Sequence, residues 1–277
     1  FFLVPLSQSF ISMWGWRIAF IVTGVLVLVV LLPANGIFIR HKPEEMGQHP
    51  DGVNPAAARK QPLAGQNKHH EIETDWSLEK ASKTVRFWAL MIFPFLATGG
   101  IYLILVHNVK FMVDQGVEKM TAALIFALVG IISSIFRIFW GWLSDRIGRE
   151  TTFTMGILCG CLGVVSLLLF ETNGSMLFTY SFSIFFGMGW GVTAPMYMSV
   201  AADLFKGRIF GLIYGFLEAG VGLGGALGAW VAGFIFDETQ SYALAFVLVI
   251  VALLVSCVFV WLAAPRKYGR QMRMTES

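Results

Sequence analysis

The stretch Gly141-Trp142-Leu143-Ser144-Asp145-Arg146-Ile147-Gly148-Arg149 separates two long apolar segments. It is short, charged and interrupted by glycine. One aspartate and two arginines cost free energy next to hydrocarbon, so a turn that carries them must lie at a membrane surface. The stretch therefore predicts a membrane protein whose apolar segments are joined by short polar turns.

The composition also favours a membrane protein. Hydrophobic residues make up 56% of the chain, charged residues 13%, and the mean hydropathy is +0.70. A soluble domain carries about 25% charged residues. The formal net charge of +3 is small and gives no indication of a nucleic-acid partner. A chain this apolar requires the lipid bilayer as its partner.

Seven apolar runs are long enough to cross a bilayer as helices, which takes about 20 residues each. None shows the two-residue alternation of a membrane barrel, so an all-α polytopic protein is expected. The runs are 17–39, 88–111, 120–143, 152–171, 175–200, 208–236 and 242–263.

Lysine and arginine are distributed unevenly between these runs. The polar segment 40–87, the turns near 144–151 and 201–208, and the tail after residue 263 hold sixteen of them, against three on the opposite side. Basic residues accumulate on the cytoplasmic side of membrane proteins. The long segment and the C-terminus are therefore predicted to be cytoplasmic, in a multi-pass protein of a plasma membrane such as the bacterial inner membrane.

The opening stretch resembles the signature between the second and third helices of each half of Major Facilitator Superfamily transporters, of the form G-x-L-a-D-r-x-G-r-[K/R]. Six positions match, namely Gly141, Leu143, Asp145, Arg146, Gly148 and Arg149. Glu150 departs, because the family usually has a base there. Further stretches, among them Gly15-Trp16-Arg17, Pro43-Glu44-Glu45-Met46-Gly47 and Phe236-Asp237, resemble the bacterial monocarboxylate-porter and oxalate/formate-antiporter branch.

The resemblance implies the C-terminal six-helix half of a twelve-helix fold, preceded by the last helix of the first half. The chain begins with Phe rather than Met and is expected to be a fragment whose partner is the missing N-terminal half. The expected division is a truncated helix end at 1–13, a full helix at 14–39, a cytoplasmic inter-half loop at 40–87, the six-helix half at 88–263 and a cytoplasmic tail at 264–277.

In that family the turn is a latch that holds the inside gate shut. The resemblance implies this gating role for Gly141, Asp145, Arg146, Gly148 and Arg149. A carboxylate such as Asp145 also suits the N-terminus of a neighbouring helix. The alternative is a surface turn that only sets the topology.

Arg137 is the candidate for binding substrate. It lies eight residues before Asp145, about 12 Å into the membrane, and its planar guanidinium suits a carboxylate ligand. In the monocarboxylate branch, an arginine four residues before the glycine that corresponds to Gly141 binds the substrate carboxylate, and Arg137 keeps this spacing. The alternative is a structural arginine paired within the bundle.

Glu218 is the acidic residue deep in a helix, ten residues after Arg208, or about 15 Å from the inner face. We expect it to form an ion pair with Arg137 that exchanges with substrate or with a proton, the candidate coupling ion. An acid at this depth disfavours a doubly charged anion. A fixed structural pair is the alternative.

Other candidates are aromatic or polar. His107 and Asn108 lie near the outer end of their helix, where a histidine can gate or relay protons, although the neighbouring Lys110 also fits a purely interfacial position. Tyr102, Trp190 and Tyr197 are candidates for lining the substrate cavity.

These patterns together predict secondary active transport of a small, monocarboxylate-like organic anion by two halves rocking around a midplane site. The alternative is an exporter of lipophilic compounds or another small metabolite, which needs no essential arginine. An enzyme would need clustered His, Asp or Cys inside the membrane, which the sequence lacks. No enzyme activity, metal or cofactor is expected, and Cys159, Cys161 and Cys257 are predicted to be reduced packing residues.

Overall fold

The computed structural model describes residues 3–38, 76–205, 207 and 210–263. Those residues form helices and no strands, in the order α1 (Leu3–Phe38), α3 (Leu78–Ser82), α4 (Val85–Asp114), α5 (Lys119–Ile147), α6 (Arg149–Asn173), α7 (Met176–Leu204), α8 (Phe210–Thr239) and α9 (Ala243–Ala263). The chain divides into two compact units, residues 9–73 and residues 1–8 with 74–277. The loop residues 40–75, the bases Lys206 and Arg208, and the tail 264–277 lie outside the described residues.

Over its described residues, each of the seven apolar runs corresponds to one long helix, which confirms the all-α prediction. The segment 40–87, which was predicted to be a loop, is helical near its end, where α3 and the first residues of α4 lie. Two side chains explain these helix starts. Ser77 accepts a hydrogen bond from the backbone N–H of Lys80, and Thr84 accepts one from the N–H of Phe87. Such caps satisfy backbone donors that a helix start leaves without partners.

Six helices are long and apolar enough to cross a membrane, namely α1, α4, α5, α6, α8 and α9. Helix α7 is long enough, with 29 residues, but it is less apolar than these six. Its Gly, Ser, Thr and Tyr residues lower the hydropathy. Many of its residues are buried by neighbouring helices instead, so protein rather than lipid surrounds much of α7.

Helix α1 is interrupted near its N-terminus. Gly15 has φ 81° and ψ 166°, a conformation open to glycine because it lacks a Cβ. The predicted division between residues 13 and 14 falls two positions before this break. The segment after Gly15 continues as helix to Phe38, with Pro33 inside it.

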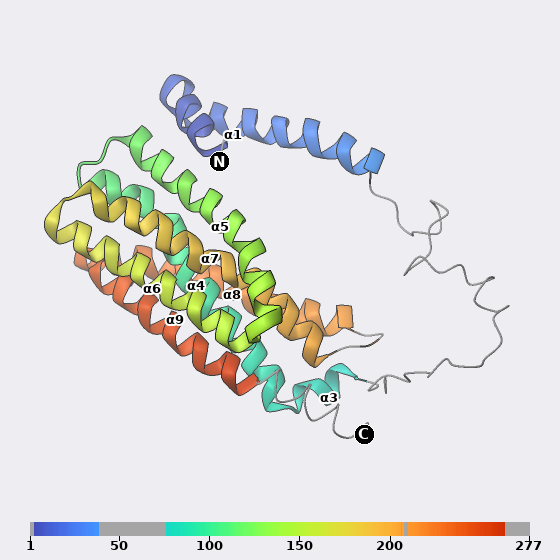
Figure 1. The fold of residues 1–277 in the computed structure, drawn as a ribbon. Coiled ribbons are helices and arrows are strands. Elements are labelled where there is room, and N and C mark those ends of the chain that lie inside the picture. Colours follow the sequence, from blue (N-terminus) through green and yellow to red (C-terminus); the bar gives the residue numbers. More distant parts are fainter. Residues whose placement is uncertain (1–2, 39–75, 206, 208–209, 264–277) are drawn as a thin grey trace, which may run out of the picture. The chain divides into compact units, whose positions relative to one another are not determined.

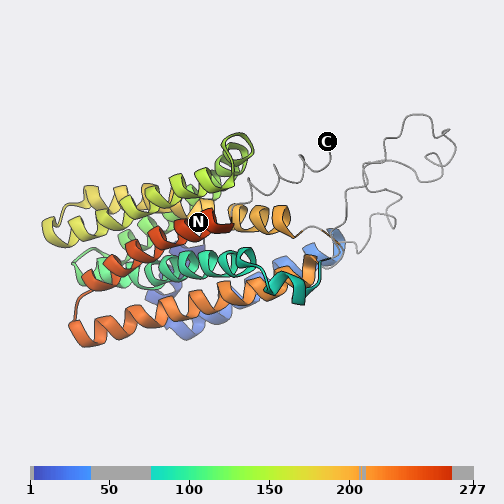
Figure 2. The same ribbon diagram turned by 90° about the horizontal axis from the view of Figure 1, so that it is seen from below.

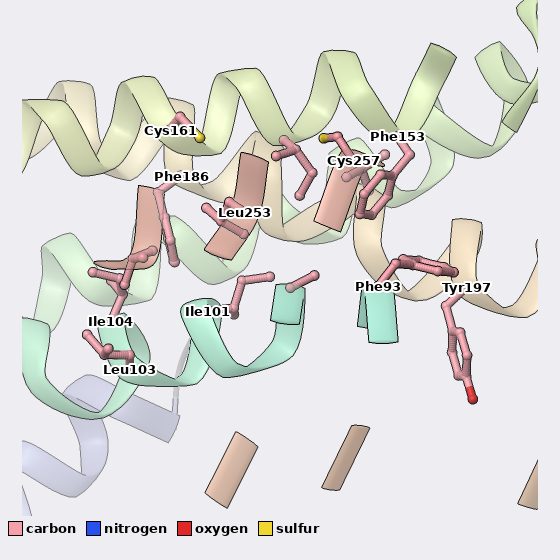
Figure 3. Packing of buried hydrophobic residues seen from close by; sticks show 14 of the residues in the cluster. Phe93, Ile101, Leu103, Ile104, Phe153, Cys161, Phe186, Tyr197, Leu253 and Cys257 are labelled. Carbon is pink, nitrogen blue, oxygen red and sulfur yellow. The ribbon is translucent and has the colours of Figure 1, made fainter. Parts of the chain in front are cut away.

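Helices α4–α9 form a bundle in which each pairs with particular neighbours (Figures 1 and 2). Helix α7 packs between α5 and α6, whereas α4 packs against α8 and α9. Their shared core is apolar and rich in aromatic rings, and Figure 3 shows part of it. Phe93 of α4 meets Phe153 of α6 edge-on, with ring centroids 5.2 Å apart. Cys161 and Cys257 lie in this core as free thiols, as predicted, and Cys159 is partly buried.

Glycine lets two helix pairs approach closely. A Cβ on Gly228 of α8 would clash with the carbonyl oxygen of Gly99 on α4, and one on Gly189 of α7 would clash with the backbone of Gly160 on α6. Small residues bring helices together in membranes, where van der Waals packing replaces the hydrophobic effect. The glycine-rich segments therefore place α7 and α8 close enough to their neighbours to build a site.

Candidate functional site

Arg137 lies in the second half of α5, and its side chain is exposed. Its guanidinium carbon is 5.8 Å from the centroid of the Trp190 ring on α7. Among the residues that the structure describes, no carboxylate lies within ion-pair distance of Arg137. A cation–π contact holds the guanidinium in place but leaves its hydrogen-bond donors free for a ligand.

Glu218 projects from the first half of α8 and is also exposed. The expected ion pair with Arg137 is not formed in the described structure, where no base lies within 4.0 Å of the Glu218 carboxylate. Tyr214 lies four residues before Glu218 on α8, so the two side chains share one face of that helix.

Tyr197 and Tyr214 bring α7 and α8 together beside this carboxylate. Their ring centroids are 5.3 Å apart, and the Tyr197 ring also contacts Phe93 of α4 at 6.1 Å. Tyr197 is 5% exposed. Its hydroxyl makes no hydrogen bond of standard length within the described part of the chain. The structure thus adds Tyr214 to the predicted candidates and associates it with Glu218 and Tyr197.

Tyr102 is exposed on α4, with its ring against Gly225 of α8. Trp190 is partly buried, and the backbone oxygen of Met188, one half-turn before it, accepts a hydrogen bond from Trp140 Nε1 at 2.8 Å. That bond ties α5 to α7 near the Arg137–Trp190 contact. Trp190 therefore has a position set by the packing of two helices.

His107 and Asn108 are already engaged within the protein. His107 Nε2 lies 3.0 Å from the Ala229 carbonyl of α8, and Nδ1 lies 3.3 Å from the Tyr242 hydroxyl. A carbonyl can only accept, so Nε2 carries the proton and, in the neutral ring, Nδ1 accepts from Tyr242. Burial raises the pKa of Tyr242, which keeps this phenol protonated as a donor. Asn108 is fully buried, and its amide nitrogen donates to two carbonyls of its own helix.

The turn at 141–149 is an ordered polar cluster. Gly148 ends α5 and begins α6 with φ 98°, a conformation that favours glycine. Arg149 then donates to Asp145 at 2.6 Å, to Ser144 at 2.5 Å and to Asp203 of α7 at 3.2 Å. The cluster joins the end of α5, the start of α6 and the end of α7.

The other charged residues of the turn have separate surroundings. The Arg146 guanidinium carbon lies 4.1 Å from the centroid of the Trp142 ring. Glu150 is 4% exposed in the first turn of α6, where a negative charge is favoured by the helix dipole. That position gives the acid a physical reason to replace the base that the resemblance implies.

Sequence reasoning missed Asp203, Tyr214 and Tyr242. Each contacts a predicted residue from a distant point in the chain, as Asp203 does Arg149 across 54 positions. The sequence signal available was only that an acid and two tyrosines are placed near helix ends. Within the described residues, no cluster of His, Cys, Asp and Glu has the arrangement of a metal site.

Comparison with known proteins agrees with this architecture. The chain is 26% identical over 238 residues to the oxalate:formate antiporter of Oxalobacter formigenes, which covers 83% of this chain and 51% of the relative. It is 25% identical to monocarboxylate transporter 12-B of Danio rerio, over the whole of this chain and 60% of the relative. The chain therefore spans about half the length of the curated relatives that it matches.

A solved structure shares the fold. An auto-inhibited peptide transporter of the POT family superposes with a TM-score of 0.55 at 21% sequence identity, over 65% of this chain and 37% of that one. Residues 1–214 match the Major Facilitator Superfamily. With its helical membrane architecture, its polar turn at 141–149 and this match over most of its length, the chain belongs to the Major Facilitator Superfamily of membrane transporters.

Proposed function

We propose that the protein containing this chain carries a small, monocarboxylate-like organic anion across a membrane by secondary active transport. Arg137 carries this proposal. It lies ten residues before the end of α5, about 15 Å along the helix, and no acid pairs with it among the described residues. A cation is costly at such depth unless a wet cavity or an anion balances it. The guanidinium fork is suited to a carboxylate.

The relatives support an anionic substrate. The oxalate:formate antiporter and the monocarboxylate transporters are named for carboxylates. The shikimate transporter of Escherichia coli, 26% identical over 217 residues, is also named for a carboxylic acid. Because all three kinds of substrate contain a carboxylate, one arginine that binds this group is the simplest common feature.

The remaining predicted residues take supporting roles in an alternating-access cycle. Asp145, Arg146 and Arg149, with the glycines of the turn, act at the inner end, where this half meets the other half of the transporter. Glu218 receives the coupling proton, so that a singly charged anion and a proton cross together. His107 shapes the outer end through its contacts with α8 and Tyr242.

The orientation follows from the distribution of basic residues. Sixteen lysines and arginines lie on the side of the long loop and the C-terminus, against three on the other side. The long loop and the C-terminus are thus cytoplasmic in a plasma membrane, such as the bacterial inner membrane. No cofactor is needed besides the proton.

Uptake into proteoliposomes tests the proposal. The full-length transporter that contains this chain is reconstituted, and entry of labelled lactate or pyruvate is measured with an imposed pH gradient. Wild type, Arg137→Gln and Glu218→Gln are compared with Lys119→Gln, which removes a base from the outer end of the same helix as Arg137.

We expect gradient-driven uptake in wild type and in Lys119→Gln. Uptake is lost in Arg137→Gln, and the response to the gradient is lost in Glu218→Gln. Normal transport by Arg137→Gln would overturn the proposal. Export of lipophilic compounds without any requirement for Arg137 would favour the alternative function.

A further inference from the structure

The Tyr197 hydroxyl is a buried polar group without a standard hydrogen bond. The residue is 5% exposed, and its hydroxyl oxygen makes no hydrogen bond in the part of the chain that the structure describes. A buried hydroxyl without a partner costs free energy, and native proteins rarely leave one so. The Tyr197 hydroxyl is therefore a place where a bound group can supply the missing hydrogen bond.

The side chains around the Tyr197 hydroxyl indicate which kind of ligand group could bind there. Tyr214 and Glu218 are four residues apart on α8 and share one face of it, and the Tyr197 and Tyr214 rings lie 5.3 Å apart. No base among the described residues lies within ion-pair distance of Glu218. A carboxylate accepts hydrogen bonds, and aromatic rings tolerate a neighbouring cation. The three side chains thus suit a hydrogen-bond donor.

Helix α7 relates this acidic group to Arg137. Trp190 contacts the Arg137 guanidinium. Tyr197 lies seven residues after Trp190 on α7. Seven residues make nearly two turns, so both side chains share one face and are separated by about 10 Å along the helix. The α7 residue beside Arg137 and the α7 residue of the acidic group therefore lie on one face of α7.

We propose that Tyr197, Tyr214 and Glu218 form a second subsite, which binds a hydroxyl or ammonium donor several bonds away from the substrate carboxylate. This inference rests on the proposed function, because it takes Arg137 as the carboxylate site. It narrows the substrate from monocarboxylates in general to those with a distal donor. A plain short-chain acid leaves the Tyr197 hydroxyl and the Glu218 carboxylate without that partner.

The two donors differ in charge, which distinguishes them. Arg137 and Glu218 have opposite formal charges, so a ligand with a carboxylate and an ammonium group leaves the loaded site neutral. A hydroxyl-bearing monoanion leaves one negative charge, which a proton on Glu218 balances. Uptake of the hydroxylated acid then depends on a pH gradient, and uptake of the amino acid does not.

Three acids of equal chain length test the subsite. Initial uptake of labelled butyrate, 4-hydroxybutyrate and 4-aminobutyrate is measured in proteoliposomes that contain the full-length transporter, with and without a pH gradient. Protein-free liposomes correct for passive entry of undissociated acid. Wild type is compared with Tyr197→Phe, Tyr214→Phe and Glu218→Gln. Tyr180→Phe is the matched control, because this tyrosine is exposed on the same helix outside the site.

We expect wild type to take up at least one donor-bearing acid about tenfold faster than butyrate, since a hydrogen bond to a charged group is worth roughly a factor of ten or more. The ratio falls toward one in the Tyr197, Tyr214 and Glu218 variants and persists in Tyr180→Phe. Equal uptake of all three acids by wild type would overturn the donor subsite while leaving the proposed function intact. So would a ratio that survives in all three site variants. Uptake of no carboxylate at all would contradict the proposed function itself.

Discussion

Arg137 and Arg149 lie on adjoining helices, yet their surroundings differ. Arg149 donates to Asp145, Ser144 and Asp203 at one end of the bundle. The Arg137 guanidinium lies over the face of the Trp190 ring and has no acidic partner among the described residues. One arginine has its charge satisfied by the fold, and the other has donors available for a ligand.

This difference separates a structural role from a binding role. A largely buried arginine is tolerated when its N–H groups donate to carboxylates and hydroxyls. Arg149, whose side chain is 23% exposed, is such a case. A guanidinium at membrane depth without such partners is retained at a cost in stability. Substitutions at the two positions should therefore affect different measurements.

The largest effect is expected from Arg137→Lys. The charge remains, but the planar fork that binds both carboxylate oxygens is lost. Carboxylate uptake should fall roughly tenfold or more, because a hydrogen bond to a charged group is worth about 1.5–3 kcal/mol. Initial uptake rates in proteoliposomes measure this fall, with Lys119→Arg as the reverse exchange at the first residue of α5. Unchanged uptake would show that Arg137 contributes only its positive charge, or that it has a structural role like that of Arg149.

The thermal stability of the protein should depend on Arg149 and Asp203 and not on Arg137. Arg149→Gln and Asp203→Asn each remove part of the turn cluster, and we expect a loss of about 1 kcal/mol, because the carboxylates are partly exposed to solvent. This corresponds to a decrease of about 2–4 °C in the unfolding midpoint. Arg137→Gln should not lower the midpoint.

Thermal unfolding in detergent measures these midpoints. Glu238→Gln is the control for Asp203→Asn, since Glu238 is exposed at the end of α8 and forms no ion pair within the described residues. A midpoint that falls as far in Arg137→Gln as in Arg149→Gln would remove the distinction between the two arginines.

A smaller effect is expected at Trp190, the ring beneath Arg137. Trp190→Leu keeps an apolar side chain but removes the cation–π contact, worth about 0.5–1 kcal/mol. The KM for carboxylate should rise roughly two- to fivefold. Trp230→Leu is the matched control, because Trp230 is exposed on α8 and stacks on Phe234. Equal changes in both variants would mean that the ring does not position Arg137.

The smallest effect concerns Glu118, a charge whose partners are backbone groups. It accepts hydrogen bonds from the N–H groups of Met120 and Thr121 at the start of α5, which lowers its pKa. A lowered pKa means that the stabilisation is present above the ordinary pKa of glutamate and is lost as the pH falls through the lowered value. Glu118→Gln should slightly lower the unfolding midpoint at neutral pH, and the difference should disappear in acid. A difference that persists in acid would assign the effect to something other than the charge.

The parts of the fold that depend on local pattern could be predicted. Apolar runs of about 20 residues can satisfy their backbone in lipid only as helices, and all seven coincide with long helices. The short helix α3 was not predicted, because its start depends on the Ser77 cap rather than on hydrophobicity. Arg137 and Glu218 could be singled out as candidates, since a charge inside an apolar run is unusual wherever it is found.

The partners of those charges could not be predicted. The expected Arg137–Glu218 pair is absent from the described structure, where the Arg137 guanidinium lies over the Trp190 ring instead. Similarly, His107 contacts Tyr242 across 135 positions, and the sequence contains no sign of this contact. Such contacts depend on how helices rotate and pack against one another, which a hydrophobic pattern leaves open.

The sequence by itself determined that this chain is a helical membrane protein with a charged turn at residues 141–149. Hydrocarbon allows few backbone structures and penalises every charge, so composition and spacing are sufficient. Only the tertiary structure decided that Arg149 is tied to Asp203, that Arg137 faces Trp190, and that the Tyr197 ring packs on Tyr214. The physical reason is the glycine-mediated packing of α7 against α5 and α6 and of α8 against α4, which brings together side chains that are distant in the sequence.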